Sequence, residues 1–229
     1  MLKAQKKISK RELKEDALIT SMAKLTTFYE ENKRNIGMIV GAVVVVVVGL
    51  LIYTKNKTEN NEKATAELGK VYPYYDSNQF QTAIDGATER GIVGLKSIVE
   101  NYGNTKAGNL ARFYLANAYL QLNKYDEALR QFEDFDPPEQ LLTISRFTGI
   151  AACYEAKGEY AKAAENYEKA ALAYPKDVDA AANLSHAADN YALAGNKDRA
   201  LELYKKLKKE YPTTQYGREA DRSIARLSA

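Results

Sequence analysis

A recurring spacing of alanines and aromatic rings is the feature that most restricts what this chain can fold into. Ala128, Ala163 and Ala200 each lie four residues before an aromatic residue and nine residues after a tyrosine. The alanines are separated from one another by 35 and 37 residues. Self-similarity at such a period is typical of solenoids, in which each unit buries its apolar face against its neighbours. The spacing therefore predicts a stack of similar helical units.

Residues that tolerate a left-handed backbone mark a turn inside each unit. Asn123, Gly158 and Gly195 stand five residues before the three alanines, where a first helix would have to end. Pro175 and Pro212, each preceded by a tyrosine, follow twelve residues after the last two alanines and would end a second helix. Each unit is therefore predicted to be a pair of helices joined by a short turn.

This pattern resembles the tetratricopeptide repeat. The second unit fills all eight positions of the family, while the third unit keeps six of them and the first unit five. The matching residues of the second unit are Phe147, Ile150, Ala151, Tyr154, Ala163, Tyr167, Ala170 and Pro175. The resemblance implies an all-α solenoid with three clear repeats.

The repeat region departs from the pattern at its two ends and in the first clear repeat. A degenerate first repeat keeps the spacing of tyrosine, turn, ring and alanine, but three later glycines predict an insertion or a broken helix. In the first clear repeat Asp136-Pro137-Pro138 would end the second helix early. The stretch from Gln215 to Leu227 is expected to be a capping helix with a polar outer face, which a solenoid needs at its open end. The degenerate repeat rests on Tyr74, Asn78, Phe80 and Ala83, and the glycines are Gly86, Gly91 and Gly94.

Residues 36–53 form an apolar run without a charge, and it includes six consecutive valines from Val43 to Val48. About 18 such residues are close to the minimum that spans a bilayer as a helix. A buried core helix and a cleaved signal peptide are the alternatives. A 35-residue leader is too long for the charged part of a signal peptide, so the run predicts one transmembrane helix.

The 35 residues before this run are basic, with nine Lys/Arg against five Asp/Glu. Charges close to the two ends of the run are balanced, but the whole tail favours an N-terminus that stays inside. Apolar residues at helical spacing, from Leu13 to Tyr29, predict a partly amphipathic tail that contacts anionic lipid, or else a solvated helix. The rest of the chain carries 24 Lys/Arg and 25 Asp/Glu, which predicts no nucleic-acid partner.

Four segments follow from these features. Residues 1–35 are expected to be a cytoplasmic tail, 36–53 the transmembrane helix, 54–63 a juxtamembrane linker or helix extension, and 64–229 the solenoid.

The resemblance also predicts where a partner would bind, because the first helix of each tetratricopeptide repeat lines a groove. A lysine and asparagine clamp for a C-terminal carboxylate is not expected, since only Asn117 fits it. The groove would suit an extended or helical polypeptide; alternatively it binds nothing specific, and the opposite face or the span makes the contact. The predicted groove residues are Leu110, Phe113, Asn117, Leu120, Gln121, Thr148, Glu155, Ser185 and Asp189.

No catalytic, cofactor or metal site is predicted. The chain lacks the phosphate-binding, zinc-binding and nucleophile motifs that would carry such chemistry. Its single cysteine, Cys153, and single histidine, His186, cannot build a site of several thiolates or imidazoles. Cys153 is expected to be a packed thiol, and His186 an ordinary, partly exposed histidine.

In layout the chain resembles the ancillary subunits of the Sec translocon, which are membrane-anchored tetratricopeptide proteins implicated in periplasmic chaperone networks. The resemblance implies a bacterial inner-membrane protein whose C-terminal domain is a periplasmic scaffold for proteins of a membrane complex. Two alternatives remain: a chaperone-like binder of unfolded exported clients, and a structural subunit of an energy-transducing or envelope-assembly complex.

Overall fold

The computed structural model describes the backbone of residues 10–228 and the side chains of residues 19–228. The chain divides into two compact units, Met1–Asn56 and Lys57–Ala229, and we call the second unit the solenoid. Part of the amphipathic pattern predicted for the tail falls on residues 1–18, whose side chains lie outside the described part of the protein. Within the described part, Met22 and Tyr29 of that pattern are exposed.

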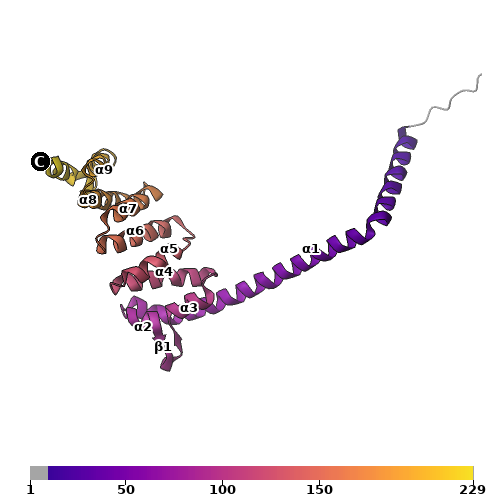
Figure 1. Ribbon diagram of the computed structural model, residues 1–229, viewed down its shortest axis with the longest axis horizontal. Helices are drawn as coiled ribbons and strands as arrows, with labels where there is room; N and C mark the ends of the chain where they lie inside the picture. The colour runs from indigo at the N-terminus through magenta and orange to yellow at the C-terminus, as the bar shows by residue number, and fades with distance from the viewer. Residues whose placement is uncertain (1–9, 229) are drawn as a thin grey trace, which may run out of the picture. The chain divides into compact units, whose positions relative to one another are not determined.

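The described part of the first unit belongs to α1 (Lys10–Asp76), and residues 57–76 of the same helix belong to the solenoid (Figure 1). Residues 54–63 are helical throughout. By length and composition, one stretch of α1 is long and apolar enough to cross a membrane. The mean hydropathy of its most apolar window is 2.9, and none of that window is buried.

The degenerate first repeat pairs the end of α1 with a second helix that is interrupted. This second helix consists of α2 (Phe80–Asp85) and α3 (Leu95–Tyr102), with a small excursion between them. The excursion consists of β1 (Gly86–Ala87), the short helix η1 (Thr88–Arg90) and β2 (Ile92–Val93), and β1 pairs antiparallel with β2. Among the described residues this ribbon is the one departure from the expected all-helical chain (Figure 1).

Glycine is required where the excursion leaves and rejoins the helices. Gly86 has φ +86°, and a Cβ there would lie 2.5 Å from the backbone oxygen of Ile92. A Cβ on Gly94 would lie 2.3 Å from the backbone oxygen of Ile84. Real Cβ atoms essentially never approach so closely. Two of the three glycines that suggested an insertion therefore allow the two crossing segments to touch.

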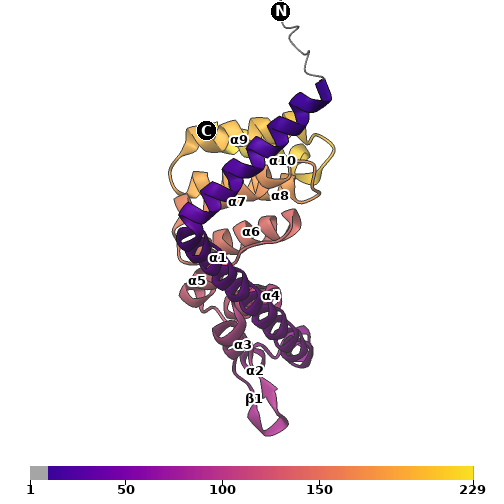
Figure 2. The same ribbon diagram turned by 90° about the vertical axis from the view of Figure 1, so that its right-hand side faces the viewer.

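Three regular helix pairs follow and are stacked in chain order (Figures 1 and 2). Each pair packs internally and against the next pair, and the last helix, α10, packs on α9 and α8. The predicted architecture of three clear repeats, a degenerate first repeat and a capping helix is confirmed. The helices are α4 (Lys106–Gln121), α5 (Tyr125–Asp134), α6 (Gln140–Ala156), α7 (Tyr160–Ala173), α8 (Ala180–Leu193), α9 (Lys197–Glu210) and α10 (Gln215–Ser228).

The turns inside the pairs have the left-handed backbone that the sequence predicts. Asn123 has φ 59°, Gly158 φ 76° and Gly195 φ 82°. Asn78 has φ 60° at the corresponding turn of the degenerate repeat. Only glycine adopts this region without a steric penalty, and asparagine is the commonest substitute. These residues end each first helix and start the second one.

The repeating alanines lie where the helices of a pair approach most closely. Ala128, Ala163 and Ala200 are completely buried. The rings four residues later, Phe132, Tyr167 and Tyr204, are also buried and fill the core around them. A methyl group and a ring on successive turns of one face allow close approach beside a large buried apolar area. The alanines and rings of the repeating pattern therefore form part of the solenoid core.

Candidate functional site

The surface considered first is the exposed side of α4, α6 and α8 together with residues 57–76 of α1, which we call the first-helix face. These helices are the first members of the four pairs, and α4 contacts α6. All nine residues predicted to line a groove belong to α4, α6 or α8.

The five predicted residues of α4 differ in burial and in their contacts with the rest of the solenoid. The ring of Phe113 packs against Phe132 and Phe135, with ring centroids 6.3 Å and 5.2 Å away. Leu110 and Leu120 are half-buried, each against a core cluster. The side-chain amide of Asn117 donates to the carbonyl of Phe113 at 2.8 Å, while Gln121 is exposed. Among these five, Gln121 is the residue most open to a partner.

In α6 and α8 the predicted polar residues bind neighbouring helices. The Thr148 hydroxyl donates to the side-chain oxygen of Asn183 at 3.2 Å. Glu155 accepts a hydrogen bond from the Tyr167 hydroxyl at 2.8 Å. Ser185 is half-buried.

Asp189 also holds a tyrosine of the second helix of its repeat. It accepts a hydrogen bond from the Tyr204 hydroxyl at 2.5 Å and lies 3.5 Å from Arg226 of α10. Burial and then the hydrogen bond to Asp189 raise the pKa of Tyr204 to about 12. Burial, followed by the hydrogen bond to Glu155, likewise raises the pKa of Tyr167. Both carboxylates therefore help to join the helices of a repeat.

A cluster of tyrosines on the same face was not recognised from the sequence. Tyr72 and Tyr75 of α1 meet Tyr114 of α4, with ring centroids 5.3 Å and 5.0 Å from that ring and 6.1 Å from each other. Tyr72 is 40% exposed. Burial raises the pKa of Tyr75 and Tyr114, and neighbouring tyrosines add to the shift. The spacing of Tyr72 and Tyr75 was visible in the sequence, but their approach to Tyr114 requires the fold.

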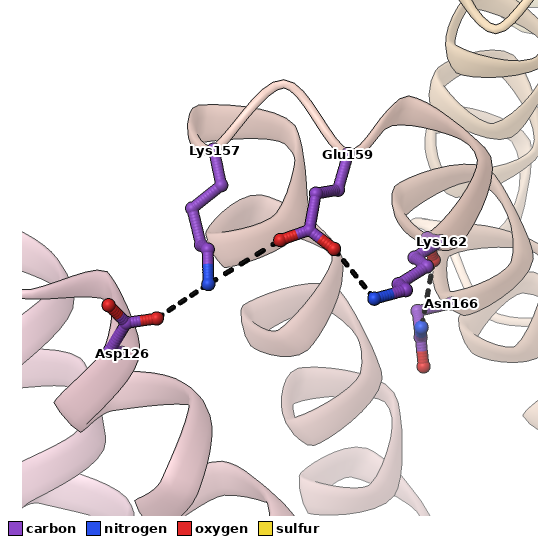
Figure 3. A network of polar contacts seen from close by, with 5 residues as sticks. All are labelled: Asp126, Lys157, Glu159, Lys162 and Asn166. Atoms are coloured by element: carbon purple, nitrogen blue, oxygen red, sulfur yellow. Dashed lines mark hydrogen bonds and ion pairs between the residues drawn. The ribbon is translucent and has the colours of Figure 1, made fainter.

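A polar network runs along one edge of the solenoid, where the turns inside the helix pairs lie (Figure 3). Lys157 pairs with Asp126 at 2.5 Å and with Glu159 at 3.4 Å, and Glu159 pairs with Lys162 at 2.7 Å. Lys162 also lies over the ring of Tyr154, with its amino group 5.1 Å from the centroid. The chain of charges connects the start of α5 to the turn between α6 and α7.

One repeat further along, the equivalent edge carries a pocket instead. Counted from the repeating alanines, Ala161 and Ala194 take the places of Asp126 and Lys157. Both alanines line a pocket of about 350 Å³, whose other walls include Glu159, Tyr160 and Lys162. None of the predicted groove residues lines it. Two methyl groups of this pocket thus stand at the positions that form an ion pair in the preceding repeat.

Among the described residues, the cysteine, the histidine and the carboxylates do not cluster into a metal site. Among the described side chains, no group of three His, Cys, Asp or Glu residues could hold a metal ion. Cys153 is completely buried, and burial raises its pKa to about 12. The ring of His186 stacks on Tyr167, with centroids 5.1 Å apart.

The helix pairs and their first-helix face define a protein of the α-solenoid class. A sequence model of the tetratricopeptide repeat family matches three segments, residues 110–135, 148–177 and 183–214. The chain therefore carries tetratricopeptide repeats, and these segments lie in the three regular helix pairs. No curated protein matches the chain.

Two similar solved structures contain TPR-like repeats from Podosopora anserina. The nearly identical TPR-like repeats of a protein described as a kinesin light chain are 17% identical to this chain, with a TM-score of 0.54 over 73% of this chain and 86% of that one. A variant of the same repeats is 16% identical, with a TM-score of 0.54 over 73% of this chain and 85% of that one. At this identity the likeness shows the fold alone. Tetratricopeptide repeats bind protein partners, which suggests a protein–protein interaction scaffold.

Proposed function

We propose that the protein is a membrane-anchored scaffold that holds protein partners on its first-helix face. The observation that carries the proposal is the combination of two features in one chain. The solenoid presents a row of first helices, and the same helix that begins this row contains an apolar stretch with none of its residues buried. An unburied stretch of that hydropathy is stable in lipid, where a helix satisfies its own backbone hydrogen bonds.

The proposed orientation keeps the N-terminal tail in the cytoplasm and exposes the solenoid on the other side, which in a bacterium is the periplasm. The excess of Lys/Arg in residues 1–35 supports this orientation. Lysines of the tail would also lie near anionic lipid headgroups. Anchoring confines the solenoid beside the bilayer, and the resulting effective concentration makes a weak contact with another membrane protein useful.

The proposed partner is a protein of an inner-membrane complex such as the Sec translocon. The layout of a basic tail, one apolar segment and a repeat domain supports this assignment. A chaperone for unfolded exported clients would use the same face but would have no fixed partner. A structural subunit of a membrane complex would be present in a fixed ratio to the other subunits.

Photo-crosslinking in living cells tests the proposal. A photoreactive amino acid at Gln121 or Ser185 of the full chain should trap the same membrane-complex protein, because both positions lie on the first-helix face. The matched control is Lys169, which is exposed on α7, a second helix. Many different trapped proteins would favour the chaperone, and equal trapping from Lys169 would contradict binding through the first-helix face.

The membrane anchor needs its own measurement. The full chain should stay in the membrane fraction after extraction with alkaline carbonate. A variant with Val45→Arg and Val46→Arg should be lost from that fraction, because each arginine costs about 3 kcal/mol at the centre of a spanning helix. Release of the unaltered chain by carbonate would contradict the anchor without testing the first-helix face.

A further inference from the structure

The tyrosine cluster, defined as Tyr72, Tyr75 and Tyr114, is an aromatic surface with a free edge. Its rings come from two first helices and lie within 6.1 Å of one another, in stacked and edge-on arrangements. Tyr72 remains 40% exposed, and no hydroxyl of the cluster forms a hydrogen bond with any described residue. Six other tyrosines of the solenoid do have such partners: Tyr74, Tyr125, Tyr167, Tyr191, Tyr204 and Tyr211.

A carboxylate lies beside this surface. Asp76 follows Tyr72 by four residues in α1, so the two side chains share one face of the helix. Asp76 is exposed and makes no ion pair with a described residue. Gly69 precedes Tyr72 by three residues, and a Cβ there would meet nothing within 4 Å. The cluster therefore has a negative charge at one end and open space at the other.

Other rings of the solenoid already have a cation of their own. Lys124 lies 6.0 Å from the ring centroid of Tyr119, Arg146 5.6 Å from that of Phe147, and Lys162 5.1 Å from that of Tyr154. No described Lys or Arg lies over a ring of the tyrosine cluster in the same way. The rings of the tyrosine cluster and the Asp76 carboxylate would attract a cation, and no described Lys or Arg occupies that position.

We propose that the tyrosine cluster and Asp76 bind an arginine side chain of the partner polypeptide. The guanidinium group is planar and weakly hydrated, so it stacks on aromatic rings while donating to a carboxylate. The ring faces of Tyr72 and Tyr114 supply the stacking surface, and the Asp76 carboxylate balances the charge. The cluster hydroxyls can form hydrogen bonds with the adjoining peptide, and the absence of a side chain at Gly69 leaves room for it. This inference rests on the proposed function, because it names the partner chemistry for the first-helix face.

Peptide binding to the full chain in uncharged detergent micelles tests the inference. The probe is a fluorescein-labelled peptide in which arginine alternates with glycine, and binding is measured by fluorescence anisotropy. The matched peptides carry lysine or glutamine in place of arginine. We expect the arginine peptide to bind more tightly than the lysine peptide, and the glutamine peptide to bind least. Equal binding of the arginine and glutamine peptides would overturn the proposal.

Variants then locate the binding surface. Tyr72→Ala and Asp76→Asn should each weaken binding of the arginine peptide about two- to five-fold, which is the range for a cation near an exposed ring. Tyr72→Phe keeps the ring and should bind as the unaltered chain does. The matched controls are Tyr174→Ala, which removes a 42% exposed ring elsewhere, and Asp85→Asn, which removes an exposed carboxylate of the same repeat.

Failure of this inference and failure of the proposed function give different results. If the control variants weaken binding as much as Tyr72→Ala does, attraction is spread over the solenoid and the arginine site is wrong. Crosslinking from Gln121 and Ser185 would still capture a partner in that case, and the scaffold proposal would stand. Circular dichroism of each variant shows whether it has folded. Tyr72→Phe keeps the ring and tests only the hydroxyl. If Tyr72→Ala unfolds, Asp76→Asn still tests the site, because it changes an exposed side chain; unchanged binding of the arginine peptide by Asp76→Asn would then overturn the proposal.

Discussion

Replacing Gly149 by alanine should destabilise the solenoid, although alanine is the better helix former. Gly149 lies in α6 and faces Phe132 of the preceding repeat. A Cβ at Gly149 would lie 2.3 Å from Cζ of that ring, far inside ordinary van der Waals contact. Phe132 is completely buried and is also packed against Phe113, so its ring has little room to move. The methyl group therefore has to displace either the ring or α6.

The expected magnitude follows from two opposing terms. Inserting a methyl group into a packed core costs about 1–3 kcal/mol, and the enclosed ring puts this site in the upper part of the range. Alanine in place of glycine within a helix returns about 0.5–1 kcal/mol. The net loss is roughly 1–2 kcal/mol, which lowers Tm by about 2–8 °C for a domain of this size.

Gly69→Ala is the matched control, because Gly69 also lies inside a helix but a Cβ there meets nothing within 4 Å. This variant should gain about 0.5–1 kcal/mol and raise Tm. Thermal unfolding of the full chain in detergent, followed by far-ultraviolet circular dichroism, gives both values. The double variant Phe132→Leu with Gly149→Ala should lose less than the sum of its single variants, since the smaller side chain relieves the clash. A Tm increase for Gly149→Ala alone would refute the reasoning.

Three further predictions concern buried or half-buried groups. Burial and then the hydrogen bond to Asp189 raise the pKa of Tyr204 from 10.0 to about 12, so its contribution to stability should be complete below pH 10 and lost as the pH rises towards 12. Unfolding measured across this pH range should show a smaller loss for Tyr204→Phe, and an identical loss would contradict the raised pKa of Tyr204. Cys153 should resist alkylation at neutral pH in the folded protein and react after unfolding, because it is buried and its pKa is raised. Mass spectrometry measures the labelling, and rapid labelling of the folded chain would mean that α6 packs differently. Tyr154→Ala should lower the free energy of unfolding by about 3 kcal/mol, because its ring packs against two core clusters; an unchanged Tm would contradict this packing.

Local periodicity was sufficient to predict the repeats. The spacing of Ala128, Ala163 and Ala200 indicated which positions would be buried, and the left-handed turns at Gly158 and Gly195 indicated where the helices would end. The turn residues act within a few residues of chain, and the alanines recur at a nearly constant period, which is why both signals can be read without knowing the fold. The glycines of the first repeat likewise indicated an interruption, but not that it would be a β-ribbon.

The first-helix face was less predictable, because a residue can have the right position and still be used by the fold. Phe113 occupies a predicted groove position, yet its ring packs against Phe132 and Phe135. Glu155 and Asp189 are on the predicted helices, but each holds a tyrosine hydroxyl of a second helix. Helical spacing gives the direction of a side chain, whereas its partners depend on which other helix lies opposite.

The sequence by itself determined the helical units, their turns, the capping helix and the apolar run, because each depends on residues close together in the chain. The tertiary structure decided which surface remains for a partner. It brought Tyr114 onto Tyr72 and Tyr75 from a different helix, and it left a pocket at Ala161 and Ala194 where the preceding repeat has an ion pair. These contacts join residues more than 30 positions apart, and only the packing of one repeat on the next sets the distances between them.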